Sequence, residues 1–203
     1  MIGVINTSFG NINAIKNIYS DLGVKCISID KYEDLRKVTK LIIPGIGNFD
    51  SVINNLKTHN VFNVVDELVK IEKIPILGIC IGMHIFFDTS DEGSSKGFGW
   101  LDGKIKKLQK PEMRYPHMGW NSVKKINNSL LFNNIDDQAY FYFLHSYGNK
   151  DGINLEYSST STEYGETFIS SIEYKNIYGV QFHPEKSHNN GIKLLTNFSK
   201  ISA

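Results

Sequence analysis

The sequence predicts an α/β fold with a central, mostly parallel sheet flanked by helices, and with additional antiparallel strands in the C-terminal half. In the first half, short apolar runs alternate with stretches of helical periodicity, which is typical of βαβ units. Beyond about Gly93, short segments of β type are separated by Gly, Asn, Asp and Ser. A length of 203 residues, 41% of them hydrophobic, suits one domain, so we expect a single domain over residues 1–203.

The first half contains four predicted strands and two predicted helices. Strands are expected at residues 2–6, 24–29, 41–43 and 74–79, and helices at 12–22 and 49–71. Gly23 ends the first helix, and Pro44-Gly45 ends the third strand. The second helix can break near 58–60. The fourth strand is the most apolar run of the chain, and we therefore place it at the centre of the sheet.

The second half contains shorter β segments and one closing helix. Strands are expected at about 104–108, 121–126, 139–146, 168–172 and 178–182, and a helix at 189–201. Two stretches rich in Asn and Ser, at 127–134 and 149–162, are expected to be exposed loops.

Charge and composition narrow the class of partner. The chain has 22 Lys and Arg residues and 21 Asp and Glu residues, a net charge of +1. This charge produces no strong positive potential that would attract nucleic acid or an anionic membrane. No run of about 18 apolar residues is present, and the N-terminus lacks the features of a secretion signal. We therefore expect a soluble, cytoplasmic protein without nucleic-acid or membrane partners, in which Cys26 and Cys80 are free thiols.

Cys80 is the candidate nucleophile. It ends an apolar strand in Gly78-Ile79-Cys80-Ile81-Gly82, which has the form of a strand-to-helix nucleophile elbow. Flanking glycines let the neighbouring backbone approach, and a helix N-terminus favours thiolate over thiol. The alternative is that Cys80 is a small core residue. Cys26 lacks a glycine frame and is interpreted as a core residue of its strand.

His183 and Glu185 are the candidates for the base and its orienting group. A cysteine nucleophile needs a histidine for proton transfer, and that histidine needs a group that fixes its tautomer. His183 follows a strand, Pro184 stops the strand, and Glu185 is close enough to turn back onto the ring. Two alternatives remain: a surface turn, or a metal site with His188 as a further ligand. We favour the catalytic interpretation and expect no bound metal.

The turn Pro44-Gly45-Ile46-Gly47 lies between a predicted strand and a predicted helix. Its backbone N–H groups could stabilise the oxyanion of a tetrahedral intermediate. It lacks the Gly-Lys-Ser/Thr ending of a phosphate-binding loop.

Five motifs together resemble the class I glutamine amidotransferases and, among them, the glutaminase subunits of imidazole glycerol phosphate synthase (HisH family). The resemblance covers nearly the whole chain. The motifs are Pro44-Gly45-Ile46-Gly47, Gly78-Ile79-Cys80-Ile81-Gly82-Met83, Tyr115-Pro116-His117-Met118-Gly119-Trp120-Asn121, Phe143-Leu144-His145-Ser146-Tyr147 and residues 179–187.

The resemblance implies a glutamine amidotransferase fold with a triad of Cys80, His183 and Glu185 that hydrolyses L-glutamine without a cofactor. It also implies a substrate and oxyanion pocket and a surface that faces a cyclase subunit, a HisF-like (β/α)8 barrel, in a heterodimer. The pocket residues would be Gly45, Gly47, Gly82, His84, Ser146 and Tyr147. The partner-facing residues would be Pro116, His117, Met118, Trp120 and Asn121.

One residue departs from the family pattern. His84 stands where the family has a glutamine whose amide helps hold the substrate, and one neutral imidazole cannot both donate and accept as that amide does. This departure leaves open a non-catalytic regulatory subunit with an impaired pocket. Two further alternatives are ammonia supply to an amino-sugar-modifying enzyme of surface glycan synthesis, since close paralogues resemble the chain in the same motifs, and a free-standing cysteine hydrolase.

Overall fold

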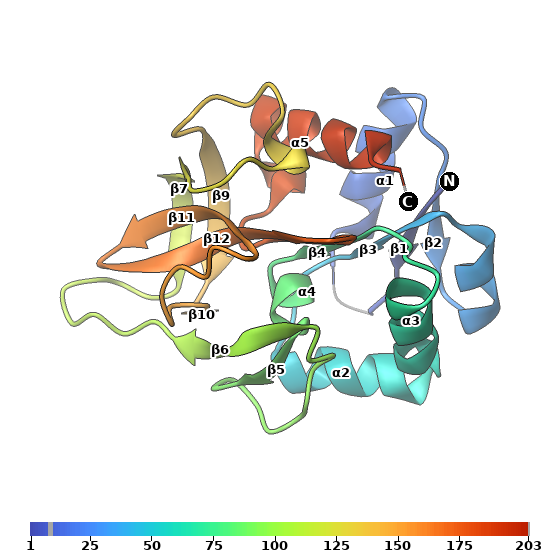
Figure 1. Ribbon diagram of the computed structural model, residues 1–203, viewed down its shortest axis with the longest axis horizontal. Coiled ribbons are helices and arrows are strands. Elements are labelled where there is room, and N and C mark those ends of the chain that lie inside the picture. The colour runs from blue at the N-terminus through green and yellow to red at the C-terminus, as the bar shows by residue number, and fades with distance from the viewer. Residues whose placement is uncertain (8–9, 203) are drawn as a thin grey trace.

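An eight-stranded sheet forms the centre of the protein in the computed structural model, which describes residues 1–7 and 10–202 (Figure 1). The strand order is β2-β1-β3-β4-β13-β12-β11-β8. The strands are β1 (Ile2–Ile5), β2 (Cys26–Ile29), β3 (Lys40–Ile43), β4 (Ile76–Ile79), β8 (Lys124–Lys125), β11 (Ser158–Tyr164), β12 (Glu166–Tyr174) and β13 (Ile177–Val180). The first five strands in this order are parallel and the last three are antiparallel to their neighbours, as the sequence predicts.

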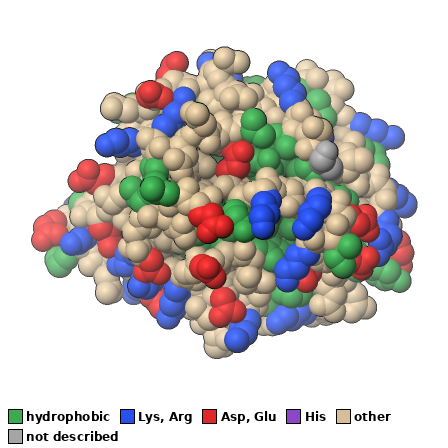
Figure 2. All heavy atoms as spheres, in the orientation of Figure 1, with side chains coloured by type: hydrophobic (Ala, Val, Ile, Leu, Met, Phe, Trp, Pro, Cys, Tyr) green, Lys and Arg blue, Asp and Glu red, His purple; other side chains and the backbone are tan. Residues whose placement is uncertain are grey.

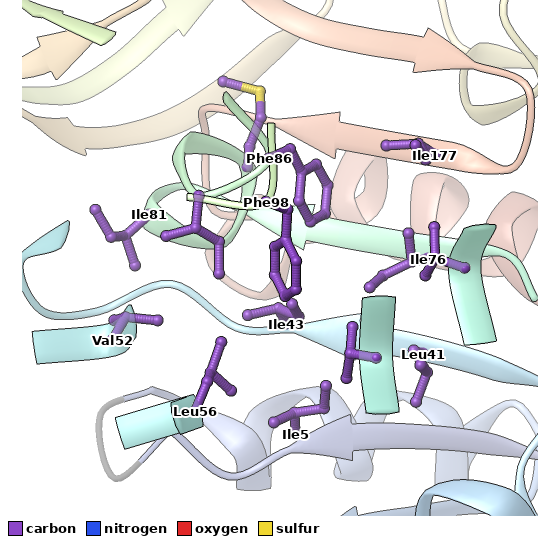
Figure 3. Packing of buried hydrophobic residues seen from close by; sticks show 14 of the residues in the cluster. Ile5, Leu41, Ile43, Val52, Leu56, Ile76, Ile81, Phe86, Phe98 and Ile177 are labelled. Atoms are coloured by element: carbon purple, nitrogen blue, oxygen red, sulfur yellow. The ribbon is translucent and has the colours of Figure 1, made fainter. Parts of the chain in front are cut away.

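Helices cover both faces of the parallel part of the sheet. α1 (Ile12–Asp21) and α5 (His188–Lys200) lie on one face, and α2 (Phe49–Thr58) and α3 (Val61–Lys70) lie on the other (Figure 1). β3 shows why both faces are apolar: Ile42 packs with residues of α1 and α5, whereas Leu41 and Ile43 pack with Val52 and Leu56 of α2 (Figure 3). Side chains alternate across a strand, so a sheet covered twice needs continuous apolar runs.

The remaining strands form two smaller sheets. A three-stranded sheet has the order β10-β6-β5, and β7 pairs antiparallel with β9. Their bounds are β5 (Phe87–Ser90), β6 (Leu101–Lys107), β7 (His117–Ser122), β9 (Tyr140–His145) and β10 (Tyr147–Gly148). α4 (Ile81–His84) is a single turn, and three 3-10 helices lie at Tyr32–Lys37, Leu130–Phe132 and Pro184–Lys186.

The expected break in the second helix is confirmed. α2 ends at Thr58, and Asn60 adopts a left-handed backbone conformation, with φ of 56°, before α3 begins at Val61. The chain turns there because an asparagine tolerates this conformation better than most residues.

One expectation about local structure is wrong in part. The stretch 149–162 is not only an exposed loop, because the buried strand β11 begins within it at Ser158. The Thr160 hydroxyl lies 2.8 Å from the hydroxyl of Ser170 and 2.7 Å from that of Ser171, and these bonds allow a polar strand to be buried. The predicted turn from strand to helix at Cys80 is confirmed, although the helix, α4, is a single turn and is followed by the strand β5.

Acidic and basic side chains are interspersed over the face shown in Figure 2, as expected for nearly balanced charge. Within the described part of the chain, no helix is both long enough and apolar enough to cross a membrane.

Candidate active site

Three neighbouring parallel strands bring the candidate residues to one edge of the sheet. Pro44 follows β3, Cys80 follows β4, and His183 lies three residues beyond the end of β13. The Cys80 backbone N–H donates to the carbonyl oxygen of Val180 at 2.7 Å, which fixes β4 and β13 in register at their ends. The carboxyl ends of parallel strands are where α/β folds form their sites.

Cys80 has the strained backbone of a nucleophile elbow. Its φ of 52° and ψ of −110° are rare for a residue with a side chain, and its thiol is nearly buried, with 7% of the residue exposed. The elbow needs close backbone packing: a Cβ on Gly82 would overlap the carbonyl oxygen of Ile43, and one on Gly45 would overlap that of Ile79. These glycines let the turn after β3 lie directly against the elbow.

Gly47 lies further along the same turn and is exposed, with φ of 126°. A side chain would be strained in this conformation, so the turn into α2 depends on a glycine here.

His183 is held by Glu185, as the sequence predicts. The two side chains are buried, and Nδ1 of His183 lies 2.9 Å from Oε1 of Glu185. The carboxylate can only accept, so Nδ1 carries the proton, and the remaining hydrogen-bonding partner of the ring is Cys80. Burial by itself lowers the pKa of His183. Hydrogen bonding and electrostatic attraction to Cys80 and Glu185 outweigh burial and raise the pKa to about 10. These two partners therefore stabilise the imidazolium form of His183.

The residues of the metal alternative have other partners in the structure. The proton on Nδ1 of His183 is directed at Glu185, and His188 is exposed and stacks on Trp120 with ring centroids 5.2 Å apart. Across residues 1–7 and 10–202, no group of three or more His, Cys, Asp or Glu side chains could hold a metal ion.

Cys26 lies on β2, apart from these residues. Burial raises its pKa to about 11, although nearby Lys16 lowers it in part. The thiol therefore stays protonated and unreactive at neutral pH.

His84 contacts Gln181, and Gln181 in turn contacts Cys80. The sequence did not lead us to expect Gln181 in the site. Nε2 of His84 lies 2.7 Å from Oε1 of Gln181, and Nε2 of Gln181 donates to the Cys80 sulfur at 3.6 Å. Both residues are buried. Burial lowers the pKa of His84 to about 4, so the ring is neutral. The alternation of side chains along an extended chain could have indicated Gln181, because it lies two residues before His183.

Ser146 lies between β9 and β10, and Tyr147 begins β10; a second pair of histidines holds the backbone here. Nδ1 of His145 lies 2.8 Å from the carbonyl oxygen of Tyr147, and Nε2 of His145 lies 3.0 Å from Nδ1 of His117. Burial lowers the pKa of His145 well below its usual value and that of His117 to about 4, so both rings are neutral.

The acceptors fix the tautomers of this pair. A carbonyl oxygen can only accept, so His145 carries its proton on Nδ1 and accepts at Nε2 from the Nδ1–H of His117. His117 then accepts at Nε2 from the side-chain amide of Asn121, 3.3 Å away. The result is a directed chain from Asn121 on β7 to Tyr147. The carbonyl oxygen of Leu144, near the end of β9, lies 3.7 Å from the Cys80 sulfur, so this segment adjoins the candidate nucleophile.

β7 presents only part of the expected partner-facing set. Met118 and Trp120 are 61% and 47% exposed, and Pro116 is exposed as well. His117 is 2% exposed and points inward, and Asn121 is half-buried. The expectation that His117 faces a partner is therefore wrong, because the alternation of β7 directs its ring into the protein.

Comparison with known proteins identifies the family of this chain. The family model of class-I glutamine amidotransferases matches residues 4–201. The chain therefore belongs to the class-I glutamine amidotransferase family.

Curated relatives are more specific. The chain is 42% identical to imidazole glycerol phosphate synthase subunit HisH 2 of Methanococcus maripaludis, over 98% of this chain and 99% of that one. It is 40% identical to subunit HisH of Bdellovibrio bacteriovorus and 38% identical to that of Leptospira interrogans, each over 99% of this chain and 100% of the relative. Within the class, the chain groups with the HisH subunits.

Solved structures support the fold. A crystal structure of a glutamine amidotransferase superposes with a TM-score of 0.76 at 14% identity, covering 98% of this chain and 99% of that chain. The structure of PurLQS from Thermotoga maritima gives 0.73 at 16% identity, covering 97% and 96%.

Proposed function

We propose that this protein is the glutaminase subunit of imidazole glycerol phosphate synthase in histidine biosynthesis, with Cys80, His183 and Glu185 as its catalytic triad. It would hydrolyse L-glutamine and pass ammonia to a cyclase subunit, a HisF-like barrel, in the cytoplasm. The observation that carries the proposal is the buried hydrogen-bonded series from Glu185 through His183 to the strained Cys80.

The reaction follows from this geometry in two stages. The Cys80 thiolate attacks the carboxamide carbon of glutamine, and His183 protonates the nitrogen, so that the C–N bond breaks and ammonia leaves. Water, deprotonated by His183, then attacks the γ-glutamyl thioester and releases glutamate. Glu185 keeps the ring oriented and stabilises its positive charge in both stages.

The oxyanion of each tetrahedral intermediate needs backbone donors. In a nucleophile elbow, the N–H of the residue after the nucleophile supplies one, here Ile81. The turn containing Gly45 packs against Ile79 and Ile81, and the following Gly47 is exposed, so this turn is positioned to supply a second donor. Ser146 and Tyr147 would hold the glutamine head group through their backbone.

Glutamate release tests the catalytic assignment. Cys80→Ala should abolish glutamate release measured in the presence of the cyclase subunit, whereas Cys26→Ala should retain it. Retained hydrolysis in the Cys80 variant would contradict the triad. A γ-glutamyl diazo-ketone should label Cys80, and absence of labelling in the complex would favour a regulatory subunit.

The partner assignment has a separate test. Met118 and Trp120 project from β7 beside the site, and Trp120 stacks on His188. Exposed aromatic residues at the centre of an interface often contribute most of its affinity. Trp120→Ala should weaken binding to the cyclase at least tenfold by calorimetry, while Tyr32→Ala, which removes an exposed aromatic residue from a 3-10 helix, should not. Equal affinity for both variants would place the interface elsewhere.

A further inference from the structure

Gln181 lies against the nucleophile but belongs to no part of the proposed triad. It directly follows β13, its exposed fraction is zero, and its backbone N–H is bonded to the carbonyl oxygen of Ser170. Its side-chain amide has one end 3.6 Å from the Cys80 sulfur and the other 2.7 Å from His84. A fully buried amide between two polar groups has a fixed orientation, and that orientation decides what faces the sulfur.

His84 determines which end of the amide faces Cys80. The ring is buried and neutral, and its Nδ1 has no hydrogen-bonding partner within the described residues. A proton on Nδ1 would leave a buried N–H unpaired, whereas a proton on Nε2 leaves only a lone pair there. With the proton on Nε2, His84 donates to Oε1 of Gln181, and the amide must direct its N–H at the sulfur.

Among the described residues, three groups are hydrogen-bonding partners of the Cys80 sulfur, and they favour different protonation states. The carbonyl oxygen of Leu144, at 3.7 Å, can accept from the neutral thiol but repels a thiolate. Gln181 and His183 both present hydrogen-bond donors, which are stronger partners for a negative sulfur than for a neutral one. The two donors, both in the segment that follows β13, therefore favour the thiolate, whereas the acceptor from β9 favours the thiol.

We propose that Gln181 is a catalytic residue that stabilises the Cys80 thiolate by direct hydrogen bonding, and that His84 is a positioning residue that fixes the Gln181 amide. This inference rests on the proposed function only in taking Cys80 as the nucleophile. It also revises the role expected for His84, because the ring's one donor is directed at Gln181 and is not free to bind substrate.

Alkylation of Cys80 tests the proposal without glutamine or partner. The rate of iodoacetamide modification, followed by mass spectrometry over a pH series, reports the thiolate fraction. All measurements use the full chain carrying Cys26→Ser, which removes the other thiol. Gln181→Met keeps a side chain of similar length without the donor. It should move the midpoint of the profile up by about one pH unit, so that alkylation below the midpoint slows about tenfold.

The His84 variants separate positioning from packing. His84→Leu leaves the amide free to turn its oxygen toward the sulfur and should shift the midpoint in the same direction by a smaller amount. His84→Gln restores a donor to Gln181 and should return the profile to that of the parent. An equal shift in both variants would reduce His84 to a packing residue and overturn its part of the proposal.

Circular dichroism shows whether Gln181→Met folds. Gln181→Glu is a second variant that tests the same role if the methionine variant is unfolded. Its carboxylate has the same shape as the amide and should shift the midpoint further upward, since a negative oxygen then faces the sulfur. An unshifted midpoint in a folded Gln181→Met or Gln181→Glu chain would overturn the role of Gln181. If the profiles shift as expected but the diazo-ketone fails to label Cys80, the proposed glutaminase function is contradicted. The roles of Gln181 and His84 at the Cys80 sulfur are then still supported.

Discussion

His183 and His145 are both buried histidines close to the same cysteine, yet their pKa values move in opposite directions. Each is largely withdrawn from water, with 1% and 6% of the residue exposed. Burial lowers the pKa of both, but His183 gains the Cys80 sulfur and the Glu185 carboxylate, which raise its pKa to about 10. His145 has a carbonyl oxygen and a neutral ring, and its pKa stays low. The chemistry of the hydrogen-bonding partners, rather than burial, makes the pKa values of the two histidines diverge.

Replacing Glu185 tests the first half of this comparison and should have the largest effect. Glu185→Gln keeps a bond to His183 but removes the charge that stabilises the imidazolium. We expect glutamate release in the complex to fall by about 10² to 10⁴. Glu112→Gln, which alters an exposed carboxylate, should leave the rate unchanged. Near-normal activity of the Glu185 variant would show that the carboxylate does not support the base.

His117→Phe tests the second half. Phenylalanine can keep the ring stacking on Phe143 and Tyr164, where centroids lie 4.8 and 4.0 Å from that of His117. The substitution removes the Nδ1–H that His117 donates to Nε2 of His145, and this buried nitrogen is left without a donor. The free energy of unfolding, measured by urea denaturation, should fall by about 1–3 kcal/mol. The exposed His59→Phe is the control. No loss of stability would mean that the histidine chain contributes only packing.

The two histidines should also differ in the pH dependence of stability. A histidine whose pKa rises on folding adds stability that is full below its unfolded pKa of about 6.5 and is lost as pH rises through the folded value. The stability advantage of the parent over Glu185→Gln should therefore shrink between pH 6.5 and about 10 in urea titrations. An advantage that is constant over this range would contradict the raised pKa of His183.

Below neutral pH, the histidines with lowered pKa values make stability fall as pH falls. This is the smallest of the expected effects. A histidine whose pKa falls on folding is neutral in the native state and binds a proton more readily when unfolded. Stability should therefore decrease as pH falls below about 6.5 toward about 4, the folded value for His117. His117→Phe should flatten this decrease. An unchanged acid slope would show that His117 does not titrate on unfolding.

The sequence predicted the parallel half of the fold well. Apolar strands and amphipathic helices carry their patterns locally, and Gly23 and Pro44 mark boundaries that agree with the structure. It failed where burial depends on distant partners. The segment beginning at Ser158 is polar, and only its bonds to the neighbouring strand β12 make it a buried strand. Local polarity could not reveal those bonds.

By itself the sequence determined the nucleophile elbow and the short-range pair of His183 and Glu185, because the spacing of residues close along the chain limits how they can meet. Only the tertiary structure decided the rest of the site. Gln181 reaches His84 and Cys80 across about a hundred residues, and His117 turns inward to His145 because β7 pairs with β9. Contacts between distant segments depend on strand order and register, and neither is set by local spacing.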